Sequence, residues 1–314
     1  MRPIILVTAV DDLAADLVVL HLRRRGASFV RFNQEDFPAH VKLAWRNSAA
    51  SATIGLDGDL ISCADIRSAW FRYSLAGAVS APQAEVDFVS HESAAFLTGF
   101  LEAMPWFWMN RPSAVAHAAN KLQQLARASE FGFCLPRTLV TNSPHAARNF
   151  VRDQPSIVKT VAAAAFSQCG ELYAVYTSPV TVDDLSDASV QAAPAIFQQR
   201  IVNECDLRVT VVGDRVFAVR ILTKRRDGEV DWRALDTARI SYERYALPAE
   251  IERRCVAFTR AFSLSFAALD FIVTPEGEHV FLEINPSGQW GWLEQATGLP
   301  ISDAIVDRLI AGEP

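Results

Sequence analysis

The chain has 314 residues, of which 50% are hydrophobic and 21% are charged. This length can form two or three lobes with a sizeable core. The formal net charge of −6 argues against a general nucleic-acid-binding surface. Five widely spaced cysteines without a Cys-x-x-Cys pair argue against a disulfide framework and a structural zinc site. No apolar run is long enough for a signal peptide or a membrane span, so we expect a cytoplasmic protein without a membrane partner.

Residues 1–110 predict a small doubly wound α/β lobe. Residues 3–9 form an apolar run rich in β-branched residues, which is typical of a buried parallel strand. Asp12 can cap the helix that follows, and Gly26 can end it. No Gly-x-Gly-x-x-Gly motif accompanies this opening, so it predicts no dinucleotide site. The other elements predicted up to residue 130 are strands at 28–33, 41–46, 52–56 and 68–73 and helices at 83–104 and 113–130.

Shorter strands and helices follow, and we predict a central lobe over 111–202 and a C-terminal lobe over 203–314. Ser143 and Pro144 have the order of a cap and a first helical residue, and Ser302 is expected to cap the closing helix. The strands predicted here span 138–141, 156–161, 172–177, 195–202, 206–222 with a turn at Gly213, 266–274 and 279–285, with a loop at 162–170 and helices at 248–262 and 302–311.

The strongest chemical signal lies in the final pair of strands. If Thr274 pairs with His279, Asp270 lies opposite Glu283, and Asn285 points to the same face as Glu283. Facing carboxylates among apolar residues repel each other unless a cation lies between them. Carboxylate and amide oxygens are ligands that magnesium takes when it also holds phosphates. We therefore predict a metal site here; an ordinary hairpin whose acids face water is the alternative.

The segment from Ala267 to Gly298, with LDFIVTPEG and VFLEINPSGQWGWLEQATGLP, resembles ATP-grasp enzymes. It is most similar to the maturases of ribosomally made peptides of the microviridin, or graspetide, type. The resemblance continues upstream in NRPSAVAHAANKLQQLARA, LPRTLVTNSP, DLRVTVVGDRVFAVRI and the DWR of Asp231–Arg233, and it covers essentially the whole chain. It implies an α/β ATP-grasp fold, in which an N-terminal βαβ pre-ATP-grasp lobe precedes the central and C-terminal lobes that clamp ATP.

The resemblance also implies roles at the nucleotide. Lys121 and Lys159 match the lysines on either side of ATP, although most lysines lie merely at the surface. Asp206 matches the acid that contacts the ribose. The three predicted metal ligands match those of the family, with Glu283 expected to bridge two magnesium ions. Many relatives have Glu where this chain has Gln, but backbone groups are still expected to bind adenine at Gln199, Arg200 and Ile201.

Arginines are the expected partners of the phosphates and the substrate. Arg208 is expected to hold phosphate or the substrate carboxylate, because a guanidinium pairs two oxygens at once. Arg233 matches an arginine that contacts the triphosphate, with Leu235 where some ligases have Asn. Arg220 points along the same hairpin, and a structural salt bridge is an equal alternative for it. The basic run 224–226 is interpreted as a solvated face.

The resemblance implies a ligase that uses ATP and magnesium on a ribosomal precursor peptide with a leader segment. An Asp or Glu side chain would become an acyl phosphate, and a hydroxyl or amine would then close an ester or amide ring. Residues 162–170 are the expected lid over this intermediate, and a homodimer is expected. The alternatives are a ligase that adds amino acids to a protein or small acceptor, a phosphotransferase, and a non-catalytic peptide-binding module.

Overall fold

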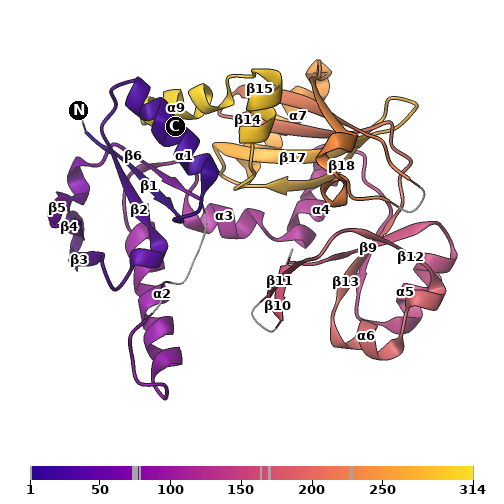
Figure 1. Ribbon diagram of the computed structural model, residues 1–314, viewed down its shortest axis with the longest axis horizontal. Coiled ribbons are helices and arrows are strands. Elements are labelled where there is room, and N and C mark those ends of the chain that lie inside the picture. The colour runs from indigo at the N-terminus through magenta and orange to yellow at the C-terminus, as the bar shows by residue number, and fades with distance from the viewer. Residues whose placement is uncertain are drawn as a thin grey trace.

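The computed structural model describes residues 2–72, 77, 79–162, 165–168, 171–226 and 229–313. Figure 1 shows an N-terminal lobe beside a C-terminal lobe, with a central lobe below the latter in this view. The last helix, α9 (Ile301–Ala311), packs against the first, α1 (Leu13–Arg24). Within the described ranges no helix is both long and apolar enough to cross a lipid bilayer. The predicted mixed α/β architecture is confirmed.

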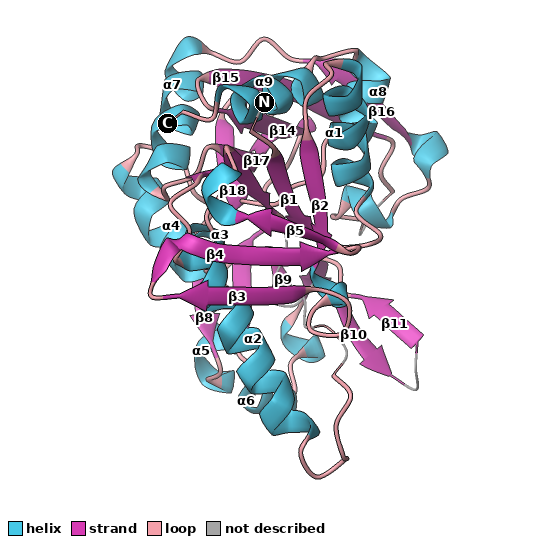
Figure 2. Cartoon of the chain, turned by 90° about the vertical axis from the view of Figure 1, so that its left-hand side faces the viewer, coloured by secondary structure: helices cyan, strands magenta, loops and turns pink. Residues whose placement is uncertain are grey.

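The N-terminal lobe is built on a parallel sheet. Besides α1, this lobe contains β1 (Ile4–Thr8), β2 (Phe29–Asn33), β3 (Lys42–Arg46), β4 (Ser48–Leu56), β5 (Asp59–Ser62), β6 (Ser68–Phe71), α2 (Val86–Glu102) and β7 (Phe107–Trp108). The sheet order is β2-β1-β6-β7, and β3-β4-β5 form a separate antiparallel sheet that is prominent in Figure 2. Ile4 and Leu6 pack with α1 and α9, and Ile5 and Val7 pack on the other face, so the strand is apolar throughout. The predicted cap is confirmed, since Asp12 accepts a hydrogen bond from the N–H of Ala14 (3.1 Å).

Two helices, not one, lead into the central lobe. These are α3 (Pro112–Ala118) and α4 (Lys121–Glu130), so the single helix predicted over 113–130 is wrong. The break arises because the side chain of Asn120 caps α4, accepting from the N–H groups of Leu122 (3.1 Å) and Gln123 (3.2 Å). Lys121 consequently opens α4 and lies at the cleft described below.

The central lobe is an antiparallel sheet covered by helices on one face. The elements are β8 (Thr138–Thr141), α5 (Pro144–Arg152), β9 (Ser156–Thr160), β10 (Ala165–Gln168), β11 (Glu171–Ala174), β12 (Ser178–Val180), α6 (Asp187–Ala192) and β13 (Ala195–Gln199). The sheet order is β12-β9-β13-β8, and Phe197 packs against α5 and α6. The loop predicted over 162–170 is wrong at 165–168, where β10 pairs with β11. Residues 163, 164, 169 and 170 of that expected lid lie outside the described part.

The C-terminal lobe is a five-stranded sheet of order β16-β15-β14-β17-β18. Its elements are β14 (Cys205–Val212), β15 (Arg215–Thr223), β16 (Ile240–Arg244), α7 (Ala249–Ala261), β17 (Phe266–Val273), β18 (His279–Asn285) and α8 (Gly291–Thr297). α7 covers one face, and the other is left for the cleft. The predicted cap of the closing helix is wrong, because α9 begins at Ile301 and the hydroxyl of Ser302 donates to the carboxylate of Glu294 (2.6 Å).

A β-bulge sets the register of the final hairpin. The N–H of Thr274 donates to the carbonyl of Glu278 (3.0 Å), so Val273 and not Thr274 pairs with His279. The predicted Thr274–His279 pair is therefore wrong. The register shifts between Asp270 and Phe271, and the predicted pairing of Asp270 with Glu283 is confirmed. A bulge re-aims the side chains beside it, which places both carboxylates on the face of the cleft.

Candidate active site

A cavity of about 390 Å³ lies between the sheets of the central and C-terminal lobes. β9 and β13 line one wall, and β14, β17 and β18 line the other. On β14, Asp206 and Arg208 face the cavity, whereas Val209 and Val211 pack in the core. The period of two along a strand therefore builds a charged wall directly on the hydrophobic core.

Two carboxylates face each other on that wall. Burial raises the pKa of Asp270 against the opposing charge of Arg208, and the charge of Glu283 raises it further. Burial would also raise the pKa of Glu283, but Lys121 and Lys159 hold it below its usual value. The arrangement is a pair of mutually repelling acids whose charges are balanced by the surrounding cations, so a metal ion fits between the acids only when an anion occupies the cations at the same time.

Two residues that were predicted to bind the substrates, Arg208 and Lys121, pair with these same acids. Arg208 binds both oxygens of Asp270, with Nη2 3.2 Å from Oδ2, and its Nη1 donates to the carbonyl of Gln289 (3.3 Å). Lys121 Nζ lies 3.5 Å from Glu283 Oε2. The groups predicted to hold substrate and phosphate thus neutralise the groups predicted to hold the metal.

Lys159 enters the cavity from the central lobe. It lies on β9 opposite Ile196 of β13, on the sheet face away from the packed helices. Burial lowers the pKa of Lys159 to about 8, an effect that the charge of Glu283 opposes and that of Lys121 reinforces. Two lysines whose charges act on the same glutamate and on each other indicate a site for an anion with several charges.

Asp206 forms an ion pair with Arg225, which also lies in the cavity. Burial raises the pKa of Asp206 to about 7, although Arg225 opposes the rise. The interpretation of 224–226 as a solvated face is therefore wrong for Arg225, whose side chain is 16% exposed. The loop between β15 and β16 brings it back over the sheet.

Arg233 is held in a fork by Asp231. Its Nε lies 2.9 Å from Oδ1 and its Nη2 lies 2.6 Å from Oδ2. Asp231 also accepts a hydrogen bond from the N–H of Thr177 of the central lobe (3.1 Å), and so links the two lobes. This geometry leaves the outer edge of the Arg233 guanidinium toward the cavity, where its charge also acts on Glu283.

The wall predicted to bind adenine is present as Gln199, Arg200 and Ile201. The N–H of Gln199 donates to the carbonyl of Arg137 (2.9 Å), and the N–H of Arg200 donates to the carbonyl of Pro155 (2.8 Å). Both N–H groups are therefore already used in hydrogen bonds within the central lobe. Within the described residues the N–H of Ile201 has no backbone acceptor. It is the donor that this wall offers to a ligand.

Two predicted residues do not line the cavity. Arg220 donates Nε to Glu243 of β16 (2.9 Å), so the structure shows the salt bridge and does not bring Arg220 to the candidate catalytic groups. Asn285 lies exposed at the end of β18, and its Oδ1 accepts a hydrogen bond from the N–H of Ser287 (2.9 Å).

Sequence reasoning missed Gln198, Arg225 and Asp231. The side chain of Gln198 is buried beside the cavity and donates Nε2 to the hydroxyl of Thr138 (2.9 Å), while within the described residues its Oε1 has no partner. A pair of glutamines at the end of an otherwise apolar strand was the available signal. Arg225 gave none, because its position depends on an irregular loop.

Comparisons with known proteins agree with this architecture. The model of the MvdD pre-ATP grasp domain matches residues 3–116, and that of the RimK-like ATP-grasp domain matches residues 118–309. The macrocyclase MdnC of Microcystis aeruginosa MRC, solved with the precursor peptide MdnA, is 28% identical with a TM-score of 0.86, over 99% of this chain and 100% of that chain.

Two further proteins broaden the comparison. A RiPP-associated ATP-grasp ligase of Chryseobacterium gregarium, solved with ADP and a leader and core peptide, is 26% identical with a TM-score of 0.87, over 100% of this chain and 98% of that chain. The probable alpha-L-glutamate ligase 2 of Shewanella amazonensis is 26% identical over 214 residues, which cover 66% of this chain and 68% of the relative. With one family model spanning most of its length, the chain belongs to the RimK-like ATP-grasp family and is an ATP-grasp ligase.

Proposed function

We propose that this ligase closes ester or amide rings in a ribosomal precursor peptide, joining Asp or Glu to Ser, Thr or Lys side chains through an acyl phosphate. The observation that carries the proposal is the facing pair Asp270 and Glu283 among Lys121, Lys159 and Arg208. Such a wall suits the transfer of a phosphoryl group, which is catalysed mainly by positioning and charge. The likeness over the whole chain to a macrocyclase and to a RiPP-associated ATP-grasp ligase, both solved with peptides, supports the substrate class.

The donor set fits magnesium. Among the described residues no cluster of three or more His, Cys, Asp or Glu side chains forms a complete metal cage. Magnesium usually takes one or two carboxylates and completes its shell with water and substrate phosphates. Asp270 and Glu283 would supply the carboxylates, with Asn285 as a third ligand if its amide turns from Ser287. When bound, magnesium neutralises charge on the phosphates as the phosphoryl group moves.

The chain's own residues would then orient both substrates. Lys121 and Lys159 hold the phosphates, and Asp206 holds the ribose. Arg208 orients the acidic side chain toward the γ-phosphate, and Arg233 binds the triphosphate from the facing loop. Arg208 would exchange Asp270 for an oxyanion of the substrate, whereas Arg233 would keep Asp231 and bind through its outer edge, so neither guanidinium is left unpaired.

We also propose the lobe boundaries, the compartment and the oligomeric state. We place the lobe boundaries near residues 110 and 202, on either side of the two connecting helices and the central sheet. The protein would act in the cytoplasm, where ATP and newly made peptides are available, and as a homodimer.

A second candidate is the addition of free glutamate to an acceptor. The name of the Shewanella relative favours it, because that protein is a probable alpha-L-glutamate ligase. The two functions share the acyl phosphate and differ in the nucleophile. Intramolecular ring closure removes one water from the peptide, whereas addition of glutamate increases its mass.

Mass spectrometry tests the proposal. An acidic Thr-, Ser- or Lys-containing peptide encoded beside this chain would be incubated with the protein, ATP and magnesium. We expect a loss of one water per ring with matching release of ADP and phosphate. A gain in mass of one glutamate residue would contradict ring closure and support the addition of glutamate. Stable phosphate on the peptide would identify a phosphotransferase.

Lys159→Ala is expected to raise the Michaelis constant for ATP at least about tenfold, because a buried cation beside the phosphates contributes a charge-assisted hydrogen bond. Peptide affinity should change less than about twofold. Steady-state kinetics against ATP and a separate peptide titration measure the two effects. Loss of peptide affinity with unchanged ATP dependence would show that the nucleotide lies elsewhere.

A further inference from the structure

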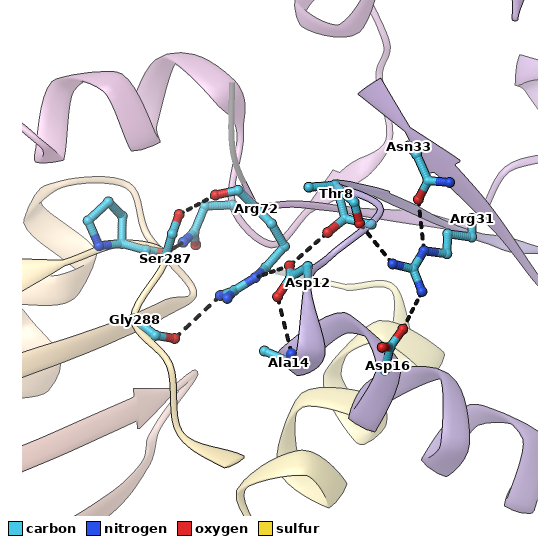
Figure 3. Close-up of polar contacts among 12 residues, drawn as sticks. Thr8, Asp12, Ala14, Asp16, Arg31, Asn33, Arg72, Ser287 and Gly288 are labelled. Carbon is cyan, nitrogen blue, oxygen red and sulfur yellow. Dashed lines mark hydrogen bonds and ion pairs between the residues drawn. The ribbon is translucent and has the colours of Figure 1, made fainter. Parts of the chain in front are cut away.

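Arg72, which follows β6, is a buried arginine outside the cavity. Its side chain and that of Asp12 are both 0% exposed, and Arg72 Nε lies 3.0 Å from Asp12 Oδ2. Asp12 also accepts hydrogen bonds from the hydroxyl of Thr8 (2.7 Å) and the N–H of Ala14 (3.1 Å). Burial alone would raise the pKa of Asp12, but the charge of Arg72 holds it below its usual value. Figure 3 shows the pair at the carboxyl end of the N-terminal strands.

Stability alone gives little reason to bury this pair. The guanidinium carbon lies 5.0 Å from the ring centre of Trp70 and 5.3 Å from that of Trp290, where an apolar side chain would also pack. Replacing a buried ion pair by apolar residues of similar volume is often neutral or stabilising. The charged pair between two tryptophans therefore points to a task that needs directed hydrogen bonds.

The hydrogen bonds of Arg72 to the C-terminal lobe indicate what this task is. Arg72 Nη1 donates a long hydrogen bond to the carbonyl of Gly288 (3.4 Å), and the hydroxyl of Ser287 donates to the carbonyl of Arg72 (Figure 3). On the opposite side, a Cβ on Gly288 would lie only 2.4 Å from the Cβ of Ala268. The turn formed by residues 286–289 is therefore held between Arg72 and the sheet.

Both ends of this turn carry residues of the candidate site. Asn285 precedes it, and its Oδ1 accepts from the N–H of Ser287 inside the turn (2.9 Å). At the other end the carbonyl of Gln289 accepts from Nη1 of Arg208 (3.3 Å), whose other nitrogens bind Asp270. A shift of the turn would displace the amide of Asn285 and withdraw one of the contacts that orient Arg208.

We propose that Arg72, oriented by Asp12, is a positioning residue that fixes turn 286–289 and thereby sets Asn285 and Arg208 for the cation and the substrate carboxylate. The inference rests on the proposed function, because it takes Asn285 as a metal ligand. It assigns to the N-terminal lobe a part in metal binding, although that lobe contributes no lining residue to the cavity among those described.

The test uses Arg72→Met combined with Asp12→Asn, which removes both charges and leaves no unpaired buried ion. Binding of a non-hydrolysable ATP analogue is titrated at increasing magnesium by calorimetry, and no peptide is needed. We expect the half-saturating magnesium concentration to rise at least about tenfold, as for other groups that orient metal ligands. Affinity for the analogue at saturating magnesium should change less than about threefold.

Arg67→Met is the matched control. Arg67 precedes β6 as Arg72 follows it, and its guanidinium donates to the carbonyl of Ile310, joining the same two lobes without touching the turn. Its magnesium midpoint should stay within about twofold of the wild type. Arg72→Lys keeps a cation beside Asp12 but loses the forked guanidinium, so we expect an intermediate magnesium midpoint. If the double variant does not fold, this variant tests the proposal in its place.

An unchanged magnesium midpoint in both Arg72 variants would overturn the proposal, as would an equal rise in Arg67→Met. A purely structural role predicts a lower melting temperature with an unchanged midpoint, which also contradicts it. If the wild-type protein binds the analogue without any dependence on magnesium, the proposed metal site fails, and that result is distinct from a failure of the positioning role.

Discussion

Glu283→Gln is expected to abolish ATP-dependent ring closure while the protein remains folded. The amide keeps the shape of the side chain but removes the charge that faces Asp270. We expect turnover at saturating magnesium to fall at least about a hundredfold, the order found when one group that stabilises developing charge is removed. Steady-state turnover measures the effect.

Stability should change by no more than about 1 kcal/mol in this variant. Attraction to Lys121 is lost, but repulsion of Asp270 is relieved. Glu243→Gln is the matched control, since Glu243 pairs with Arg220 on the same sheet outside the cavity. It should keep near wild-type turnover. Near wild-type turnover in Glu283→Gln would contradict the metal assignment.

Arg208→Ala is expected to stop ring closure and to leave binding of the leader segment nearly unchanged. The guanidinium is the group on β14 that can exchange Asp270 for an acidic side chain of the peptide. Loss of a forked ion pair to the reacting carboxylate should lower turnover at least about a hundredfold. Titrations with the full precursor and with the leader alone separate the two effects.

The same variant leaves Asp270 without its partner. Removing one member of a buried pair is destabilising, so the melting temperature should fall without magnesium and recover when magnesium and nucleotide are added. Arg220→Ala, on the neighbouring strand, should keep ring closure, because Arg220 binds Glu243 outside the cavity. Loss of leader binding in Arg208→Ala, or normal ring closure, would contradict the role given to Arg208.

Strand alternation was the part of this site that could be read from the sequence. Asp270 and Glu283 interrupt two apolar strands, and Asp206 and Arg208 share one strand face, so their convergence follows from the period of two. The Asp270–Glu283 pairing was reached from a wrong turn register, and the β-bulge restored it. Bulges depend on packing that no local pattern records.

Contacts between lobes and contacts made by irregular loops could not be predicted in the same way. Arg72 and Gly288 are 216 positions apart and meet only after the C-terminal lobe packs on the N-terminal sheet. Arg225 reaches Asp206 through an irregular loop. The break between α3 and α4 was readable in principle, because Asn120 is a good cap, but the apolar pattern continues across it.

In the proposed reaction a peptide carboxylate attacks the γ-phosphate of ATP in this cleft. The most direct test places heavy oxygen in the Asp and Glu carboxylates of the precursor peptide and follows it by mass spectrometry. In an acyl phosphate the bridging oxygen comes from the carboxylate and leaves with phosphorus when the ring closes. We predict released phosphate with one heavy oxygen and formation of ADP. Unlabelled phosphate, or AMP with pyrophosphate, would contradict the account.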